Sequence, residues 1–163
     1  MGIPEISSKK ILDNLSEGEK FGLAMAKKGL GGKHNMTDED WDRFISVPSN
    51  LKLVLHTPEM MKYRIVAECV ESKFCTAGIK VGQKFIFSTV PNMFLPDESD
   101  APPCIKALAP LGEHMHGIWE RMFEELDPNE GMTYYVGCLD PGPEYAGMGH
   151  VVFRLYVEKK EEE

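Results

Sequence analysis

The hydrophobic pattern of this chain changes its period near residue 60, and this change constrains the fold more than any other feature. Before that point, apolar residues recur at helical spacings of three and four. Beyond it, several segments alternate between apolar and polar residues, as half-buried β-strands do. The clearest is His150 to Glu158, where one face would carry Val151, Phe153, Leu155 and Val157. The sequence therefore predicts a helical amino-terminal part followed by a part that contains a sheet.

Three further strands are predicted, at Lys62 to Glu71, Lys84 to Phe87 and Met132 to Gly137. A tight turn over Gly78 to Gly82 joins the first two of them. Between the second and third lies one strong helical pattern, with apolar residues three or four apart from Leu108 to Leu126 and glutamates opposite. Pro110 falls early in this stretch, so the helix is either kinked there or begins there.

A helix laid across an antiparallel or mixed sheet would bury the apolar faces of both. We therefore expect an α+β fold, with a small antiparallel or mixed sheet covered by one long helix and an N-terminal helical extension. The change of period places the boundary. Residues 1–58 are expected to form the helical extension or arm, and residues 59–163 the α+β core domain.

Capping signals mark the first helices of the amino-terminal part. Ser7 or Ser8 can cap a first helix, and Ser16-Glu17-Gly18-Glu19 has the pattern of a capping box that starts a second. Gly29 and the pair Gly31-Gly32 are expected to stop this second helix, because glycine tolerates the left-handed conformation at a helix end.

A third helix is predicted from the capping residues Thr37 to Asp40 to a point near Pro48. These helices are short and have narrow apolar stripes, so we expect them to pack on the remainder of the chain or on a second subunit. One hypothesis is therefore a homo-oligomer in which the arm embraces a neighbour. Its anchors would be Phe21, Leu23, Trp41 and Phe44.

Composition excludes several classes of function. The formal charge of −8 over 163 residues argues against non-specific nucleic-acid binding, which needs clustered lysine and arginine. The sequence shows no apolar run of membrane-spanning length and no secretion signal, so we expect a cytoplasmic protein that does not bind membranes. In a reducing cytoplasm, the four cysteines are expected to be thiols or metal ligands rather than disulfides.

Three of the four cysteines lie where the chain is expected to turn. Cys75 opens the predicted Gly78 to Gly82 turn, Cys104 follows two prolines at the start of the helical pattern, and Cys138 follows an aromatic strand. Because functional residues are commonly placed on loops, a shared thiol-lined site is one interpretation. Cys69 alternates with apolar residues of its strand and is expected to lie in the core.

Cys104 is the strongest single candidate for chemistry. In the first turn of a helix, unpaired N–H groups and the helix dipole would favour the thiolate, which is the nucleophilic form. Alternatively, Cys104 fills the core, because it shares a helix face with Leu108 and Leu111. If Cys75, Cys104 and Cys138 met, they could form a zinc or other soft-metal site with a histidine as fourth ligand.

Histidines and polar residues near these cysteines are further candidates. His114 or His150 could act as a base beside Cys104, and His150 opens the last strand near Cys138. Lys80 could bind an anionic ligand, although a solvated lysine is the simpler interpretation. Asp140 could bind a ligand or hold the turn at Pro141 and Gly142, and Tyr145 adds aromatic character to the same loop. The ligand itself is unknown, and a small molecule fits this hypothesis.

Short motifs spread over the core domain resemble those of a known group of proteins. These motifs are Cys75-x-x-Gly78-x-Lys80-x-Gly82, Pro103-Cys104-x-x-Ala107, Cys138-x-Asp140-Pro141 and Val152-Phe153-x-Leu155. Over about residues 61–158 the chain resembles a family of small uncharacterised bacterial α+β proteins. That family usually has an acidic residue where this chain has Gln83. The resemblance implies a fold rather than an activity.

Three functions remain open from the sequence. The first is a protein with a binding or accessory role in bacterial metabolism, whose cysteines line a ligand or metal pocket. The second is a small cofactor-free or metal-assisted lyase or isomerase that uses Cys104 with His114 or His150. The third is an oligomerising interaction module that uses the helical arm.

Overall fold

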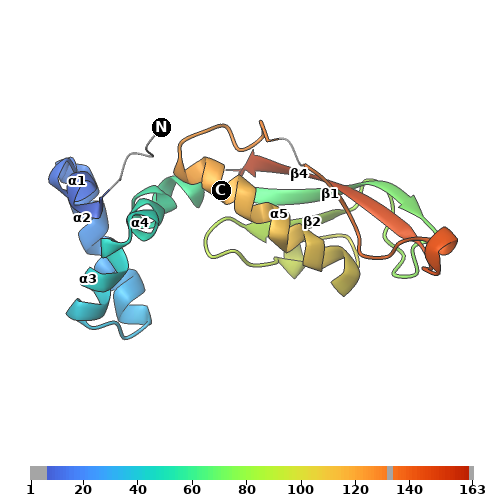
Figure 1. Cartoon of the computed structure of the whole chain (residues 1–163), viewed down its shortest axis with the longest axis horizontal. Coiled ribbons are helices and arrows are strands. Elements are labelled where there is room, and N and C mark those ends of the chain that lie inside the picture. The colour runs from blue at the N-terminus through green and yellow to red at the C-terminus, as the bar shows by residue number, and fades with distance from the viewer. Residues whose placement is uncertain (1–6, 132–133, 162–163) are drawn as a thin grey trace. The chain divides into compact units, whose positions relative to one another are not determined.

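The computed structural model describes residues 7–131 and 134–161 and divides the chain into two compact units, Met1–Pro58 and Glu59–Glu163. The first unit is helical, and the second contains a four-stranded antiparallel sheet and a long helix (Figure 1). The chain therefore has the α+β fold that its change of period predicts. Among the described helices, none combines the length and the apolar character needed to cross a membrane.

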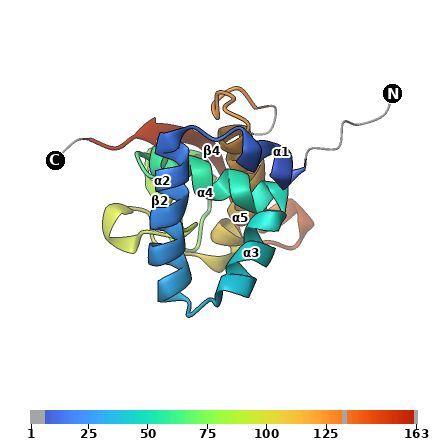
Figure 2. The ribbon, with the colours of Figure 1, turned by 90° about the vertical axis from the view of Figure 1, so that its left-hand side faces the viewer.

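From residue 7 onward, the first unit contains four α-helices, whose arrangement can be followed in Figure 2. They are α1 (Ser8–Asp13), α2 (Glu17–Ala26), α3 (Asp38–Ser46) and α4 (Pro48–Met60), the last of which ends just past the unit boundary. The predicted caps are confirmed. Ser7 caps α1, Ser16 and Glu19 form a capping box on α2, and Thr37 and Asp40 form one on α3.

The prediction that glycines stop the second helix is wrong. After α2 the chain continues through a π-helical turn, Lys27–Gly31, and Gly32 is still in the right-handed helical conformation. The left-handed residue is Asn35, with φ of 54°, and Met36 N–H closes the end on the carbonyl of Gly31 at 2.9 Å. Asparagine also tolerates this conformation, so it supplied the stop signal that we assigned to glycine.

Helix α4 was not anticipated from the sequence. Its first residue is Pro48, which suits that position because the first turn of a helix leaves its N–H groups unpaired anyway. Pro58 lies inside its last turn. Leu51 and Val54 of α4 are buried, as is Trp41 of α3, so α4 supplies much of the small core of this unit.

The sheet of the second unit has the strand order β2-β1-β4-β3, and all neighbouring strands are antiparallel. The strands are β1 (Tyr63–Lys73), β2 (Lys84–Ser88), β3 (Tyr135–Gly137) and β4 (His150–Lys159). Residues 132 and 133 of the predicted third strand lie outside the described residues. The register of β1 on β4 shifts between Cys69 and Glu71, which marks a β-bulge.

Helix α5 (Ile105–Phe123) lies across the sheet (Figure 1). Its buried residues recur three and four apart, as the helical pattern predicts, and they join the inward-facing strand residues in one hydrophobic core. The helix contributes Ala107, Leu111, Met115 and Ile118, and the strands contribute Ile65, Ala67, Cys69, Phe85, Phe87, Val136, Val151, Phe153, Leu155 and Val157.

Pro110 lies inside α5, which begins five residues earlier. Proline has no N–H, so the carbonyl of Lys106 loses the hydrogen bond that a helix would normally give it. That carbonyl instead accepts a hydrogen bond from the N–H of Leu139 at 2.8 Å. The proline therefore frees a helix acceptor that holds the chain after β3 against the start of α5.

Candidate functional site

Four separate segments of the second unit meet at one small pocket, and the three turn cysteines all line it. The cavity measures about 30 Å³. Roughly 10–15 Å³ is enough to hold one water molecule, so the pocket has room for one or two molecules of that size. Its lining residues are Cys75, Thr76, Ala77, Ile79, Cys104, Lys106, Ala107, Cys138, Asp140, Gly149, His150 and Val151.

The turn after β1 delivers Cys75 to the pocket. The carbonyl of Cys75 accepts a hydrogen bond from the N–H of Gly78 at 3.0 Å, and the hydroxyl of Ser72 donates to the carbonyl of Ile79 at 2.7 Å. Gly78 has φ of 78° and Gly82 has φ of 89°. Both values lie in the left-handed region that favours glycine. The connection holds two hydrogen-bonded turns, Cys75 to Gly78 and Lys80 to Gln83, rather than the one tight turn that was predicted over Gly78 to Gly82.

Cys104 is the N-cap residue of α5, one position before the first turn in which we predicted it. Its carbonyl accepts hydrogen bonds from the N–H groups of Ala107 and Leu108, at 3.0 and 2.9 Å. Its thiol makes no capping bond to the helix, which is described in full. The side chain is half-buried rather than sealed in the core, so its sulfur remains open to chemistry at the pocket.

Cys138 directly follows β3 and is held beside the start of β4. Its N–H donates to the carbonyl of Val151 at 2.8 Å, and its thiol lies 3.8 Å from the carbonyl oxygen of Asp140. His150 lines the same pocket, and its Nδ1 atom lies 3.5 Å from that same carbonyl oxygen. Cys138 and His150 are thus brought together at the two ends of one loop, as the sequence suggested.

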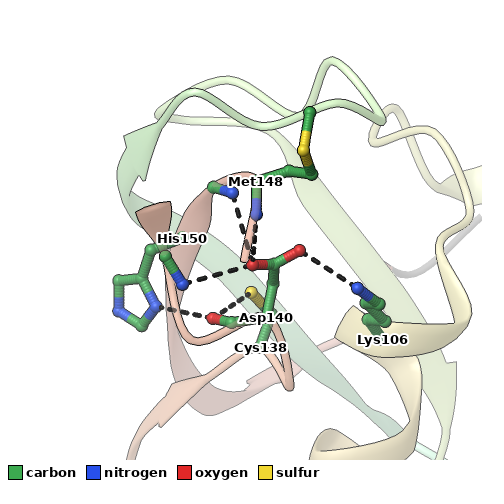
Figure 3. Close-up of polar contacts among 7 residues, drawn as sticks. Lys106, Cys138, Asp140, Met148 and His150 are labelled. Atoms are coloured by element: carbon green, nitrogen blue, oxygen red, sulfur yellow. Dashed lines mark hydrogen bonds and ion pairs between the residues drawn. The ribbon is translucent and has the colours of Figure 1, made fainter. Parts of the chain in front are cut away.

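The carboxylate of Asp140 holds this loop in place (Figure 3). Oδ1 accepts hydrogen bonds from the N–H groups of Gly142, Met148 and Gly149, at 3.2, 2.9 and 3.3 Å. Oδ2 pairs with the ammonium group of Lys106 at 3.1 Å. The Lys106 contact, followed by these N–H groups, lowers the pKa of Asp140 to about 2. Its carboxylate is therefore occupied in holding the turn.

Two glycines allow the loop to pack this closely. A side-chain carbon at Gly147 would collide with the carboxylate of Asp140 and lie 2.7 Å from the backbone nitrogen of Gly142. One at Gly149 would collide with the backbone carbonyl of Phe74 and lie 2.7 Å from that of Lys73. Gly149 therefore brings the start of β4 against the turn that carries Cys75.

Three of the predicted site residues do not line the pocket among the described residues. The ring of His114 contacts the carbonyl oxygen of Pro110 in its own helix, with Nδ1 at 2.9 Å. Lys80 and Tyr145 are exposed to solvent. Of the two candidate histidines, His150 lines the pocket and His114 does not.

Cys69 lies in the core, as its place in the strand pattern predicts. Its side chain is fully buried, and burial raises the pKa of its thiol, with the neighbouring Cys75 contributing in the same direction. A thiol with a raised pKa is a poor nucleophile. Cys69 therefore provides an unreactive reference beside the three half-buried cysteines of the pocket.

The structure does not support a preformed metal centre. All four cysteines lie in the described part of the chain and are free thiols. Among the described residues, no three histidine, cysteine, aspartate or glutamate side chains are grouped so that they could hold a metal ion. The predicted zinc or other soft-metal site therefore stays a prediction, and its three cysteines share a pocket.

Each pocket cysteine has an exposed apolar neighbour in the sequence. Phe74 directly precedes Cys75, Ile105 directly follows Cys104, and Leu139 directly follows Cys138. These three side chains are 77%, 78% and 62% exposed. They are not among the residues that line the pocket.

The fold and the site define a class: an α+β protein with a small pocket lined by three free thiols. No family model, curated protein sequence or solved structure was found to match the chain. The functional assignment below therefore depends on the geometry of this pocket.

Proposed function

We propose that this is a cytoplasmic bacterial protein with a binding or accessory role, and that the pocket lined by Cys75, Cys104 and Cys138 is its functional site. The pocket takes small thiol-reactive molecules rather than whole metabolites. The observation that carries this proposal is that three cysteines from three distant segments line one cavity. Cysteines that serve only as core filler have no reason to converge in this way.

The size of the cavity favours binding of a very small molecule over catalysis on a metabolite. Ligand pockets usually enclose about 300–1,000 Å³, whereas this cavity has about 30 Å³. A lyase or isomerase that used Cys104 with His150 would need room for its substrate. The exposed apolar side chains of Phe74, Ile105 and Leu139 support an accessory role, because exposed apolar residues suit contact with another protein.

The proposal is tested by the size of the reagent that reaches the thiols. We expect methyl methanethiosulfonate to modify Cys75, Cys104 and Cys138 in the native protein while Cys69 stays unmodified, as read by peptide mass spectrometry. A bulky aromatic disulfide reagent should react with these three thiols much more slowly. After unfolding in urea, both reagents should modify all four cysteines, because the pocket no longer excludes the larger one.

Equal rates for the small and the bulky reagent in the native protein would show that the pocket does not select by size. Labelling of Cys69 at the same rate as the other three would show that the native fold does not distinguish the pocket cysteines. Either result contradicts the proposed function. Triple replacement of the pocket cysteines by serine is the matched control, and it should abolish native labelling.

The helical unit supports a second proposal, that the chain forms a homo-oligomer through α2. The residues of α2 are all described, and none of them is buried. Phe21 and Met25 are 69% and 54% exposed and lie four residues apart, so they share one face of the helix. Trp41, which we expected to be an anchor, is buried within the unit and does not contribute to this surface.

We expect the double variant F21S/M25S to sediment as a smaller species than the wild-type chain, because it removes the apolar face that would join two copies. L126S is the matched control, since Leu126 is also exposed but lies in the second unit. An identical sedimentation coefficient for F21S/M25S and the wild-type chain would contradict an oligomer built on α2.

A further inference from the structure

We propose that Cys104 and Cys138 form a disulfide within one chain when hydrogen peroxide enters the pocket, which makes the pocket an oxidant-responsive site. This inference rests on the proposed function, because it requires that the pocket thiols react with small molecules. It goes further by assigning the reacting pair and the chemical class of the reagent.

The choice of pair follows from how the segments are tied together. The N–H of Leu139, next to Cys138, donates to the carbonyl of Lys106, two residues after Cys104, at 2.8 Å. The side chains of Lys106 and Asp140 add an ion pair at 3.1 Å between the same two segments. The start of α5 and the chain after β3 are therefore joined by two bonds, and neither bond uses a thiol.

Both thiols are free to react in this arrangement. Cys104 makes no capping bond to the described helix, so its side chain can rotate about its own bonds without costing α5 a hydrogen bond. The thiol of Cys138 makes a long contact of 3.8 Å with the carbonyl of Asp140. Cys75, in contrast, belongs to the turn after β1, where its carbonyl accepts from Gly78 and the hydroxyl of Ser72 in β1 donates to the carbonyl of Ile79. Cys69 is sealed in the core.

The pocket matches the reagent in size. Its volume of about 30 Å³ has room for hydrogen peroxide, which is little larger than water. Cumene hydroperoxide carries a phenyl ring and two methyl groups and is far too large for this volume. The pocket therefore favours the smallest peroxide over its larger relatives.

The reaction balances in two steps. One thiolate sulfur attacks a peroxide oxygen and the O–O bond breaks. A sulfenic acid forms, and the thiol proton leaves with the released oxygen as water. The second thiol sulfur then attacks the sulfenic sulfur, the S–O bond breaks, and a second water leaves. The two sulfurs lose two electrons in total, and one peroxide molecule gains them.

The test uses the full reduced chain, treated with one equivalent of hydrogen peroxide and then with N-ethylmaleimide. We expect a loss of two alkylatable thiols per chain and a crosslinked peptide that joins Cys104 to Cys138, found by mass spectrometry without reduction. The same amount of cumene hydroperoxide should leave the thiol count unchanged. C75S is the matched control and should still form the crosslink.

C104S and C138S should each lose the crosslink, and dimedone should trap a sulfenic acid on the cysteine that remains in at least one of them. A disulfide that includes Cys75, a disulfide found only between chains, or unchanged thiols after peroxide would overturn the inference. If methyl methanethiosulfonate still labels the three pocket thiols in that case, the proposed function stands and only the peroxide chemistry fails. If it labels none of them, both fail.

Discussion

At the scale of single residues, Asp140 does more to shape the site than any cysteine in it. One oxygen of its carboxylate gathers three backbone N–H groups of the β3–β4 loop, and the other pairs with Lys106 at the start of α5. Hydrogen bonds between a carboxylate and several N–H groups are strong because the acceptor is charged. The loop that carries Cys138 and His150 therefore depends on an ionised Asp140.

This dependence predicts how stability responds to acid. The folded-state pKa of Asp140 is about 2, below the ordinary value of 3.8. A lowered pKa gives stability that is fully present above pH 3.8 and is lost as pH falls towards about 2. We expect D140N to melt at a lower temperature than wild type at pH 7. The difference in melting temperature between D140N and wild type should decrease as pH falls from 3.8 towards about 2, as followed by circular dichroism.

D13N is the control, because Asp13 is an exposed aspartate of the other unit. It should follow the wild-type melting curve at every pH. A constant difference in melting temperature between D140N and wild type from pH 7 to pH 2 would show that the charge of Asp140 does not hold the loop.

Gly149 gives a second prediction at this scale. A methyl group there would meet the backbone carbonyls of Lys73 and Phe74, which cannot rotate away as a side chain could. We expect G149A to lower the free energy of unfolding by at least about 1–3 kcal/mol, the usual cost of overpacking. Urea titration measures this change.

Gly117 offers the matched substitution, because it lies in α5 with open space around it. G117A should raise stability by about 0.5–1 kcal/mol, since alanine is the better helix former. Equal effects of G149A and G117A would mean that the approach between β4 and the Cys75 turn is not tight.

The sequence allowed some of these residues to be predicted and concealed others. The three pocket cysteines could be singled out because each stands at the end of an element, and element ends can meet at one edge of a sheet. Lys106 and Gly149 gave no such signal, because their roles come from contacts with residues far away in the chain. The role of Gln83 also could not be predicted from the sequence. Its side chain accepts from the N–H of Lys80 and donates to the carbonyl of Asp100, and an ionised carboxylate at this position could not make the second of these bonds.

At the scale of elements, α5 shows how a residue that disfavours helices can serve a neighbouring loop. Pro110 leaves the carbonyl of Lys106 without its helical donor, and Leu139 takes that place. The sequence predicted a helix here from its apolar spacing but left open whether Pro110 kinks the helix or begins it. The role of Pro110 in freeing the carbonyl of Lys106 becomes visible only with the position of Leu139, which depends on the whole sheet.

Replacing the proline separates these two effects. In P110A the new N–H competes with Leu139 for the carbonyl of Lys106. We expect the helix to gain up to about 3 kcal/mol and the loop to lose about 1 kcal/mol with its hydrogen bond. Global stability should therefore rise while the amide of Leu139 exchanges faster with deuterium.

The amide of Cys138 is the internal reference, because it bonds to Val151 and not to α5. Its exchange through local opening should change little. Unchanged exchange at Leu139 in P110A would show that the proline does not control this tether.

Helix α4 shows that the sequence pattern alone does not reveal every helix of this chain. Its sequence, from Pro48 to Met60, carries a proline at each end and a weakly amphipathic pattern, and it was not assigned as a helix. Burial of Leu51 and Val54 stabilises it, which is a tertiary effect that no local propensity reports. Short helices with marginal propensity are predictable only once their packing partners are known.

At the scale of the molecule, the chain divides into two compact units, and the change of hydrophobic period lies close to their boundary. We expect a fragment that starts at Glu59 to unfold cooperatively in urea and to keep the labelling pattern of the pocket thiols. Met60 must be retained, because it is buried and its carbonyl accepts the hydroxyl hydrogen of Thr89 at 2.6 Å.

A fragment that starts at Lys62 is the control and should be less stable, since it lacks Met60. If the fragment from Glu59 gave no cooperative transition, the sheet unit would require the helical unit in order to fold.

The order of the strands also governs when the sheet can assemble during synthesis. Strand β1 can pair with β2 soon after both are synthesised. The other edge of β1 pairs with β4, which is synthesised much later, and this pairing joins Lys73 to His150 and Tyr63 to Lys159. Until then, the strand that is to become central has one row of open backbone donors and acceptors, which other nascent chains can bind. Ribosomes that stall before residue 150 would therefore release products prone to aggregate, and slower translation would prolong that exposure.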